Sequence, residues 1–193
     1  MHEQPAQSER FVLHPTAIAG VMEVELRPVA DARGTFVRLF EPAAFAGTGL
    51  FPSGPVQVNV ARTDRAGTVR GLHWQDAVDG EVEEAKLVTC IAGRVLDVAV
   101  DMREDSPTRF GHHALELGPQ LDRALLIPPG VAHGMQALED ASVLVYLHSA
   151  NYQPGMERGA RPDDPAVAIC WPLPVAHLSE RDRSHPPLAR PAA

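Results

Sequence analysis

Two short segments of this chain concentrate side chains that could move protons. The first, Arg70–Gln75 with the sequence RGLHWQ, carries a histidine and a glutamine two positions apart. In a strand these two side chains share one face, whereas Arg70 lies on the other face unless Gly71 marks a bulge. Because imidazole changes its charge near neutral pH, His73 is a candidate acid or base. This signal is weak by itself, since most histidines in strands are packed or exposed rather than catalytic.

The second segment covers residues 127–134, with the sequence IPPGVAHG. Proline restricts the backbone and glycine permits a sharp bend, so these residues predict a rigid turn followed by a strand. We expect the turn to direct His133 inward from the start of that strand. The chain would then hold a second imidazole near its interior.

The elements that must position these residues are short runs of β-forming residues separated by turn signals. The 15 glycines and 18 prolines are many for 193 residues and indicate numerous short elements rather than a helical bundle. The dipeptide Ala92-Gly93 is predicted to link two strands as a hairpin. This spacing favours an antiparallel sandwich or barrel. The predicted strands are Val21–Leu26, Thr35–Phe40, Val56–Val60, Thr68–Trp74, Lys86–Ile91, Arg94–Met102, His113–Leu117, Ala124–Ile127 and Ser142–His148.

Alternation within two of these strands predicts which side chains share a face. In Ser142–His148, Tyr146 and His148 share a side with polar tips, which faces a cavity or solvent, and the valines and Leu147 form a core face. In the strand after Arg94, Asp97 and Asp101 share one face. That face is either solvated or lines a polar interior, and periodicity does not decide between the two.

Length and composition predict one domain over residues 1–193, with its core at about residues 11–182 and a loose tail at 183–193. The formal net charge of −8 disfavours binding to nucleic acid or to anionic lipid. Cys90 and Cys170 lie far apart, which predicts no disulfide framework and no thiolate zinc site. The N-terminus has no apolar segment and no run of 18 apolar residues occurs, so we expect a soluble, cytoplasmic protein without a membrane partner.

Several motifs occur in the order and spacing of a known family. They are RGLHWQ, EAKLV, GRVLDVAVDMREDSPT, IPPGVAHGMQAL, VYLHSANYQPGMERG and LSERD. From about Val21 to Asp182 the chain resembles the dTDP-4-dehydrorhamnose 3,5-epimerases. The resemblance implies an all-β cupin fold (a double-stranded β-helix or jelly roll) with short flanking helices. It also implies inversion of C3 and C5 of a nucleotide-linked 4-keto-6-deoxyhexose by a homodimer, with no cofactor and no metal.

The resemblance implies a role for each of twelve residues. His73 matches the general base, Asp182 its partner, and Tyr146 the proton donor on the opposite face of the sugar. Lys86 and His133 match residues near the sugar ring and its 4-keto oxygen. The other implied substrate-binding residues are Gln57, Asn59 and Arg70 for diphosphate and sugar, Tyr152 for the base, Glu157, and Arg33 and Phe36, which the family donates from a neighbouring subunit.

These roles fit the chemistry of a proton beside a ketone, which is acidic only where the resulting enolate is stabilised. A neutral imidazole takes the proton, and a carboxylate fixes its tautomer and stabilises the imidazolium. A positioned base contributes about 10²–10⁴-fold and a donor at the enolate oxygen about 10²–10³-fold. The ammonium group of Lys86 can supply a positive charge and a donor for that oxygen. A phenol such as Tyr146 can return the proton to the other face.

Other functions stay open at this point. A metal-dependent cupin typically carries a His-x-His pair, but here Gln75 stands at the second position, and two imidazoles with one amide make a poor iron or zinc site. A non-catalytic sugar-nucleotide binder would not need the four catalytic residue types together. An epimerase acting at C3 only or at C5 only fits equally well. The sequence assigns no role to His2, His14, His112, His113, His177 or His185, and only a secondary one to His148.

Overall fold

The structure is a computed structural model and describes residues 10–76 and 83–189. All ladders between its strands are antiparallel in this part of the chain. The strands are β1 (Phe11–Pro15), β2 (Met22–Leu26), β3 (Val29–Asp31), β4 (Gly34–Phe36), β5 (Gln57–Thr63), β6 (Val69–Gln75), β7 (Lys86–Ala92), β8 (Val95–Asp101), β9 (His112–Leu117), β10 (Arg123–Ile127), β11 (Val131–Ala137), β12 (Ser142–His148) and β13 (Glu157–Gly159). The helices are α1 (Pro42–Phe45), a 3-10 turn at Ala46–Thr48, and α2 (Glu180–Ser184).

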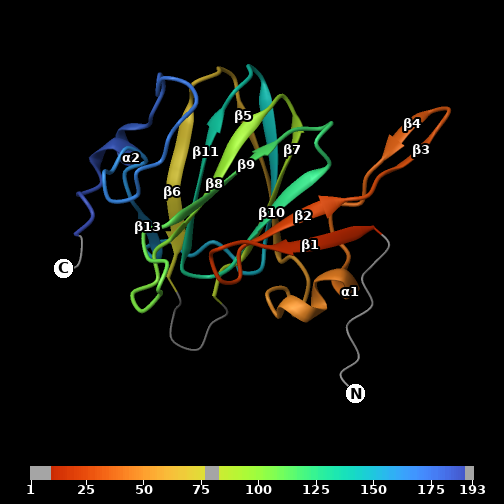
Figure 1. The fold of residues 1–193 in the computed structure, drawn as a ribbon, viewed down its shortest axis with the longest axis horizontal. Helices are drawn as coiled ribbons and strands as arrows, with labels where there is room; N and C mark the ends of the chain where they lie inside the picture. Colours follow the sequence, from red (N-terminus) through yellow and green to blue (C-terminus); the bar gives the residue numbers. More distant parts are fainter. Residues whose placement is uncertain (1–9, 77–82, 190–193) are drawn as a thin grey trace.

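Two sheets pack face to face and form a sandwich (Figure 1). The six-stranded sheet has the order β1-β2-β10-β7-β12-β5, and the five-stranded sheet has the order β13-β6-β11-β8-β9. Leu125 and Leu144 of the first sheet meet Val95 and Met135 of the second in one buried cluster. The predicted antiparallel sandwich is therefore confirmed. In the described residues, neither helix is long or apolar enough to cross a membrane.

Both outer faces of the sandwich are also covered. Phe45 and Phe51, from α1 and the loop after it, pack against Val145 and Leu147 of the six-stranded sheet. Trp171 and Leu188, near the C-terminal end of the described chain, pack against the outer face of the five-stranded sheet. The predicted core face of β12 is thus confirmed, and its other face, with Tyr146, points between the sheets.

The predicted strands correspond to observed ones, and Ser142–His148 does so residue for residue. The predicted strand Thr35–Phe40 is wrong beyond Phe36. The residues that follow leave the β3–β4 hairpin and pack their apolar side chains against the outer face of the six-stranded sheet. The prediction missed β1, β3 and β13, and its list of strands omits β11, although a strand was expected after the turn that precedes His133. In β11 all seven residues are buried, so the strand shows no alternation between apolar and polar positions.

The predicted hairpin at Ala92-Gly93 is wrong. The strands on either side, β7 and β8, belong to different sheets, so this link crosses from one layer of the sandwich to the other. Gly93 has a φ of 68°, and a Cβ at this position would collide with Ser142. The local sequence correctly indicates a sharp turn. Which strand the chain pairs with afterwards depends on partners distant in sequence.

The predicted loose tail at 183–193 is wrong for its first part. Arg183 and Ser184 belong to α2. The Leu188 side chain packs on the core, and its backbone N–H donates to Asp164 at 2.8 Å. Residues 190–193 of the predicted tail lie outside the described residues.

Asp97 and Asp101 line a polar interior, which settles the choice left open by the alternation in β8. Both are fully buried. The Asp101 carboxylate accepts two hydrogen bonds of 2.8 Å from the Arg103 guanidinium and others from Ser106 and Thr108. Burial raises the pKa of Asp101, but these hydrogen bonds outweigh it and hold the pKa well below its usual range.

We expect Asp101→Asn to lower the free energy of unfolding at pH 7 by about 3 kcal/mol, because Arg103 loses its charged partner. The depressed pKa of the folded state means that this stability is present above the unfolded-state pKa of about 3.9. It is lost as the pH falls toward the folded-state value. Urea unfolding of both proteins from pH 7 to pH 2.5 should therefore show a difference that shrinks below about pH 4. A difference that does not change with pH would contradict this assignment.

Candidate active site

A cavity of about 390 Å³ opens between the sheets and collects most of the predicted site residues. Strands β5, β7 and β12 of one sheet and β6, β11 and β13 of the other contribute side chains to its wall. Asp182 lies directly behind this wall, in contact with His73. The predicted residues that line the cavity are Gln57, Asn59, Arg70, His73, Lys86, His133, Tyr146, Tyr152 and Glu157.

An irregularity at Gly71 brings Arg70 and His73 into the same cavity. The register between β6 and β11 shifts at this point. Gly71 has a φ of 123°, and a Cβ there would lie 2.5 Å from the Cα of Gly134 and 2.8 Å from the carbonyl oxygen of His133. Only glycine fits this close approach of two strands. The bulge left open by the sequence is therefore present.

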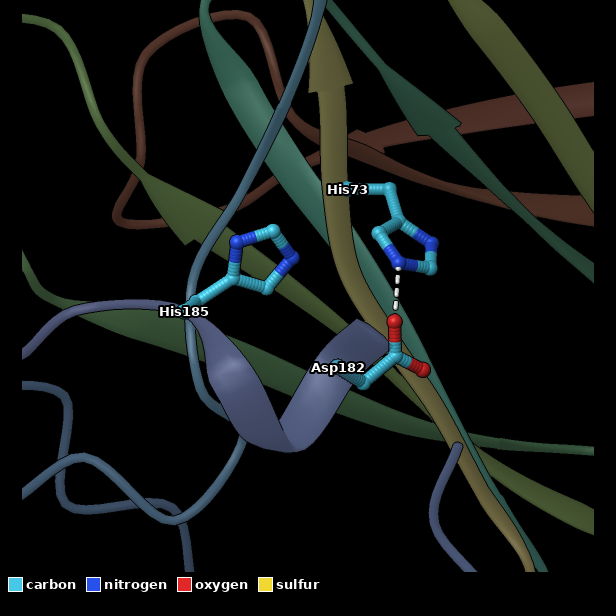
Figure 2. Close-up of side chains that lie close together, drawn as sticks. All are labelled: His73, Asp182 and His185. Carbon is cyan, nitrogen blue, oxygen red and sulfur yellow. Dashed lines mark hydrogen bonds and ion pairs between the residues drawn. The ribbon is translucent and has the colours of Figure 1, made fainter. Parts of the chain in front are cut away.

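His73 and Asp182 form a hydrogen-bonded pair of 2.7 Å between Nε2 and Oδ1 (Figure 2). Asp182 comes from α2, and the hydroxyl of the N-cap residue Ser179 accepts the Asp182 backbone N–H at 3.0 Å. The His73 side chain is 41% exposed and that of Asp182 only 6%. Burial raises the pKa of Asp182, but the hydrogen bond from His73 helps to hold it below its usual value. The carboxylate thus accepts the Nε2 proton, which leaves Nδ1 able to take a proton.

Lys86 stands in a charged network along the β7 side of the cavity. Its Nζ lies 2.9 Å from Glu84 and 3.4 Å from the carbonyl oxygen of His73. Glu84 also accepts the Nδ1–H of His148 at 2.9 Å, and His148 Nε2 lies 3.3 Å from the Asn59 amide. Burial raises the pKa of Glu84, but its bonds to His148 and Lys86 outweigh this and lower the pKa. The network holds a largely buried ammonium group at the cavity wall.

Tyr146 faces the cavity from β12, in the sheet opposite to that of His73. Its ring meets the edge of the His133 ring at 5.5 Å and stacks beside His148 at 6.1 Å. Burial, helped by the negative charge of Asp97, raises the pKa of Tyr146 above its ordinary value of 10. The phenol therefore keeps its proton at neutral pH and is able to donate it.

His133 points inward, as the turn before it predicts. Its Nε2 lies 2.7 Å from Asp97, and both side chains are buried. In the pairing of β11 with β6, His133 lies directly opposite His73. This backbone register sets the two imidazoles in adjacent strands of one cavity wall.

The rim of the cavity holds Tyr152 and Glu157. The Tyr152 hydroxyl donates to Glu157 at 3.0 Å, and Arg181 donates to the same carboxylate at 2.9 Å. The Gln57 side chain accepts the backbone N–H of Tyr152 at 3.1 Å. Half of Tyr152 is exposed, so part of its side chain is open to solvent at the rim.

Arg33 and Phe36 lie outside this cavity. They belong to the β3–β4 hairpin, which projects away from the sandwich (Figure 1). Phe36 is 69% exposed, and the Arg33 guanidinium pairs only with nearby Asp31 among the described residues. Within one chain the structure does not bring these two predicted site residues together with the others.

Two residues of the site were missed, Glu84 and Asp97, and His185, outside the cavity wall, was not expected near it. Glu84 precedes Lys86 by two positions, a spacing that places both on one face of an extended chain. For Asp97 the alternation predicts only a solvated or interior face and no role at the site. His185, to which the sequence assigns no role, lies beside His73 and Asp182 (Figure 2), and burial lowers its pKa.

Comparison with known proteins connects this geometry to a family. Residues 15–190 match the family model described as dTDP-4-dehydrorhamnose 3,5-epimerase. The chain belongs to this family. A dTDP-4-dehydrorhamnose 3,5-epimerase of Streptomyces griseus is 38% identical over 92% of this chain and 86% of the relative. A dTDP-4-dehydrorhamnose 3-epimerase of Streptomyces niveus is 39% identical over 89% of this chain and 81% of the relative.

Solved structures of epimerases have the same fold. The 4-keto-6-deoxy sugar epimerase NovW of Streptomyces spheroides superposes with a TM-score of 0.84 at 37% identity, over 94% of this chain and 88% of its own. The 3'-monoepimerase ChmJ of Streptomyces bikiniensis, in complex with dTDP-quinovose, gives a TM-score of 0.82 at 32% identity, over 90% of this chain and 86% of its own. The expected cupin fold and the expected enzyme class, an epimerase among the isomerases, are both confirmed.

Proposed function

We propose that this epimerase inverts C3 and C5 of a nucleotide-linked 4-keto-6-deoxyhexose. The observation that carries the proposal is the position of His73 and Tyr146 on opposite sheets of one cavity. Inversion at a carbon requires that a proton leave one face and that another arrive at the opposite face. A base on one wall and an acid on the other meet this requirement, whereas one imidazole alone does not.

The base in this mechanism is the Nδ1 atom of His73. Asp182, bonded to Nε2, holds the ring in the tautomer that leaves Nδ1 without a proton and stabilises the imidazolium that forms. Lys86 supplies positive charge where the 4-keto oxygen becomes an enolate oxygen, an interaction that strengthens as charge develops. Tyr146 then gives its proton to the other face of the carbon. The ketone itself acidifies both neighbouring positions, so the reaction needs no cofactor.

The substrate we propose is a dTDP-linked sugar. A related epimerase of Bacillus anthracis was solved with TDP and pyrophosphate, and one of Legionella pneumophila with dTDP-4-keto-L-rhamnose. In this chain, Gln57, Asn59 and Arg70 line the cavity and offer donors to a diphosphate and a sugar. Tyr152 offers a half-exposed ring against the base. His133 and Glu157 complete the substrate contacts at the sugar and at the rim.

We also propose that the enzyme works as a homodimer. Val58 and Val60, on the edge strand β5 of the six-stranded sheet, are 59% and 51% exposed. An apolar edge strand of this kind is typical of a surface covered by another chain. The projecting β3–β4 hairpin would carry Arg33 and Phe36 into the partner's cavity.

The cytoplasm remains our proposed location, supported by the free thiols of Cys90 and Cys170.

The alternative function is inversion at C3 only. The Streptomyces niveus relative and ChmJ, both named as C3 epimerases, are as similar to this chain as the 3,5-epimerases are. Incubation with dTDP-4-keto-6-deoxyglucose in deuterium oxide, followed by NMR of the sugar, separates the two functions. Deuterium at both C3 and C5 supports the 3,5-epimerase, and deuterium at C3 alone supports the alternative. The absence of deuterium from both carbons would overturn the proposal.

Asp182→Asn is expected to reduce kcat by about 10–100-fold, because an amide no longer selects the reactive tautomer of His73. Binding of dTDP should change little, since Asp182 lies behind the wall of the cavity rather than in it. Steady-state kinetics with dTDP titration separates the two effects. Glu180→Gln, a change of an exposed residue on the same helix, is the matched control and should keep kcat. Full activity of Asp182→Asn would show that the pair is not needed.

A further inference from the structure

A second imidazole lies close to the His73–Asp182 pair. Asp182 belongs to the short helix α2, and His185 follows directly after the last residue of this helix, in extended backbone. Together with His73 from β6 they offer three ligand atoms that all lie within 4.8 Å of one another. Within residues 10–76 and 83–189, no other three His, Cys, Asp or Glu side chains come together in this way.

The His185 ring supplies an independent sign that the cluster lacks a ligand. Its Nε2 is buried and has no hydrogen-bond partner among the described residues. The ring lies against Gly159, at the point where β13 pairs with His73. Figure 2 shows one ring nitrogen of His185 directed toward the side of the cluster where His73 and Asp182 meet. An imidazole nitrogen buried without a partner costs free energy that a bound ion would return.

We propose that His73, Asp182 and His185 bind a divalent transition-metal ion, with zinc as the best fit, and that this ion inhibits the enzyme. Two imidazoles and one carboxylate, with water as the fourth ligand, form a set that zinc accepts. Ligand atoms in a tetrahedral zinc site lie about 3.3 Å apart, given metal–ligand distances of about 2.0 Å. Small side-chain rotations therefore suffice to close the cluster around an ion. Mg²⁺ and Ca²⁺ prefer oxygen ligands and should not compete.

Inhibition follows from the atoms that the ion would occupy. It would displace the hydrogen bond between His73 Nε2 and Asp182, so the carboxylate would no longer orient the His73 ring or fix its tautomer. A second cavity of about 620 Å³ also borders His73 and Asp182, so an ion can reach the cluster without crossing the substrate cavity. The inhibitory effect rests on the proposed role of His73 as base, whereas metal binding does not.

The experiment titrates Zn²⁺ into the chelator-treated full-length protein and measures binding by calorimetry and, with Co²⁺ as a probe, by visible absorption. We expect one ion per chain, tetrahedral cobalt bands, and affinity about tenfold or more weaker in His185→Ala. His177→Ala, which changes a histidine beside the second cavity but outside the cluster, is the matched control. No binding, or equal affinity in His185→Ala and the wild type, would overturn the metal site. Circular dichroism and thermal unfolding confirm that both variants are folded.

The activity measurements test inhibition separately. The chelated enzyme is expected to keep full activity, excess Zn²⁺ to reduce it about tenfold or more, and EDTA to restore it. His185→Ala should keep basal activity and resist Zn²⁺, whereas His177→Ala should remain sensitive. Zinc binding with unchanged turnover would overturn inhibition and leave the site in place. If the enzyme does not turn over the dTDP-sugar at all, the binding measurements still decide the metal site, and only the proposed function fails.

Discussion

His73→Asn is expected to abolish deuterium exchange at the substrate sugar and to reduce turnover by about 10²–10⁴-fold. Asparagine is smaller than histidine, and its amide cannot accept a proton near neutral pH. The variant loses the Nε2 hydrogen bond to Asp182 together with the ring, whereas Lys86 keeps its partners, Glu84 and the backbone carbonyl of residue 73. The loss should therefore fall on proton removal rather than on assembly of the site.

Binding and chemistry are separated by measuring both on the same variant. The affinity for dTDP, determined by calorimetry, should stay close to that of the wild type, because the proposed nucleotide contacts come from Tyr152 and from β5 and β6 residues such as Gln57 and Arg70. His112→Asn, on exposed β9, controls for the loss of a histidine elsewhere. Exchange at the wild-type rate in His73→Asn would assign the base to another residue.

Tyr146→Phe should separate the two faces of the reaction. The variant keeps His73, Asp182 and Lys86, so it should still remove the substrate proton and form the enolate. Without a phenol on the β12 side, the proton returns from His73 to the face that it left. We expect deuterium at C3 or C5 in sugar of unchanged configuration, with inverted product reduced by about 10²-fold or more.

The measurement follows deuterium incorporation and product configuration in the same NMR time course. Tyr152→Phe is the matched control, because it removes the other tyrosine hydroxyl of the chain, at the rim of the cavity. That variant should weaken substrate binding while the ratio of inversion to exchange stays unchanged. Inverted product from Tyr146→Phe at nearly the wild-type rate would mean that another group donates the proton. His148, on the same face of β12 and in the same cavity, is then the next residue to test.

Much of the site was predictable from local sequence. Alternation in Ser142–His148 correctly separated the face of Tyr146, predicted to meet a cavity or solvent, from the core face, and the two prolines and glycine before His133 correctly turned that residue inward. The resemblance across several motifs identified the family and nine residues that line one cavity. These features are visible in sequence because strand alternation and turn chemistry are decided within a few residues.

The tertiary structure decided what depends on distant partners. Asp97 and Asp101 alternate like a solvated face, but the packing of the six-stranded sheet against this side of the five-stranded sheet makes that face interior. Ala92-Gly93 codes for a turn, yet β8 pairs with β9 and β11, which follow it in the chain, and not with β7 before it. Arg70 enters the cavity only because Gly71 and Gly134 let two strands approach closely. His185 meets His73 across 112 residues, a contact made by the packing of α2 on β6 and absent from any local period of the sequence.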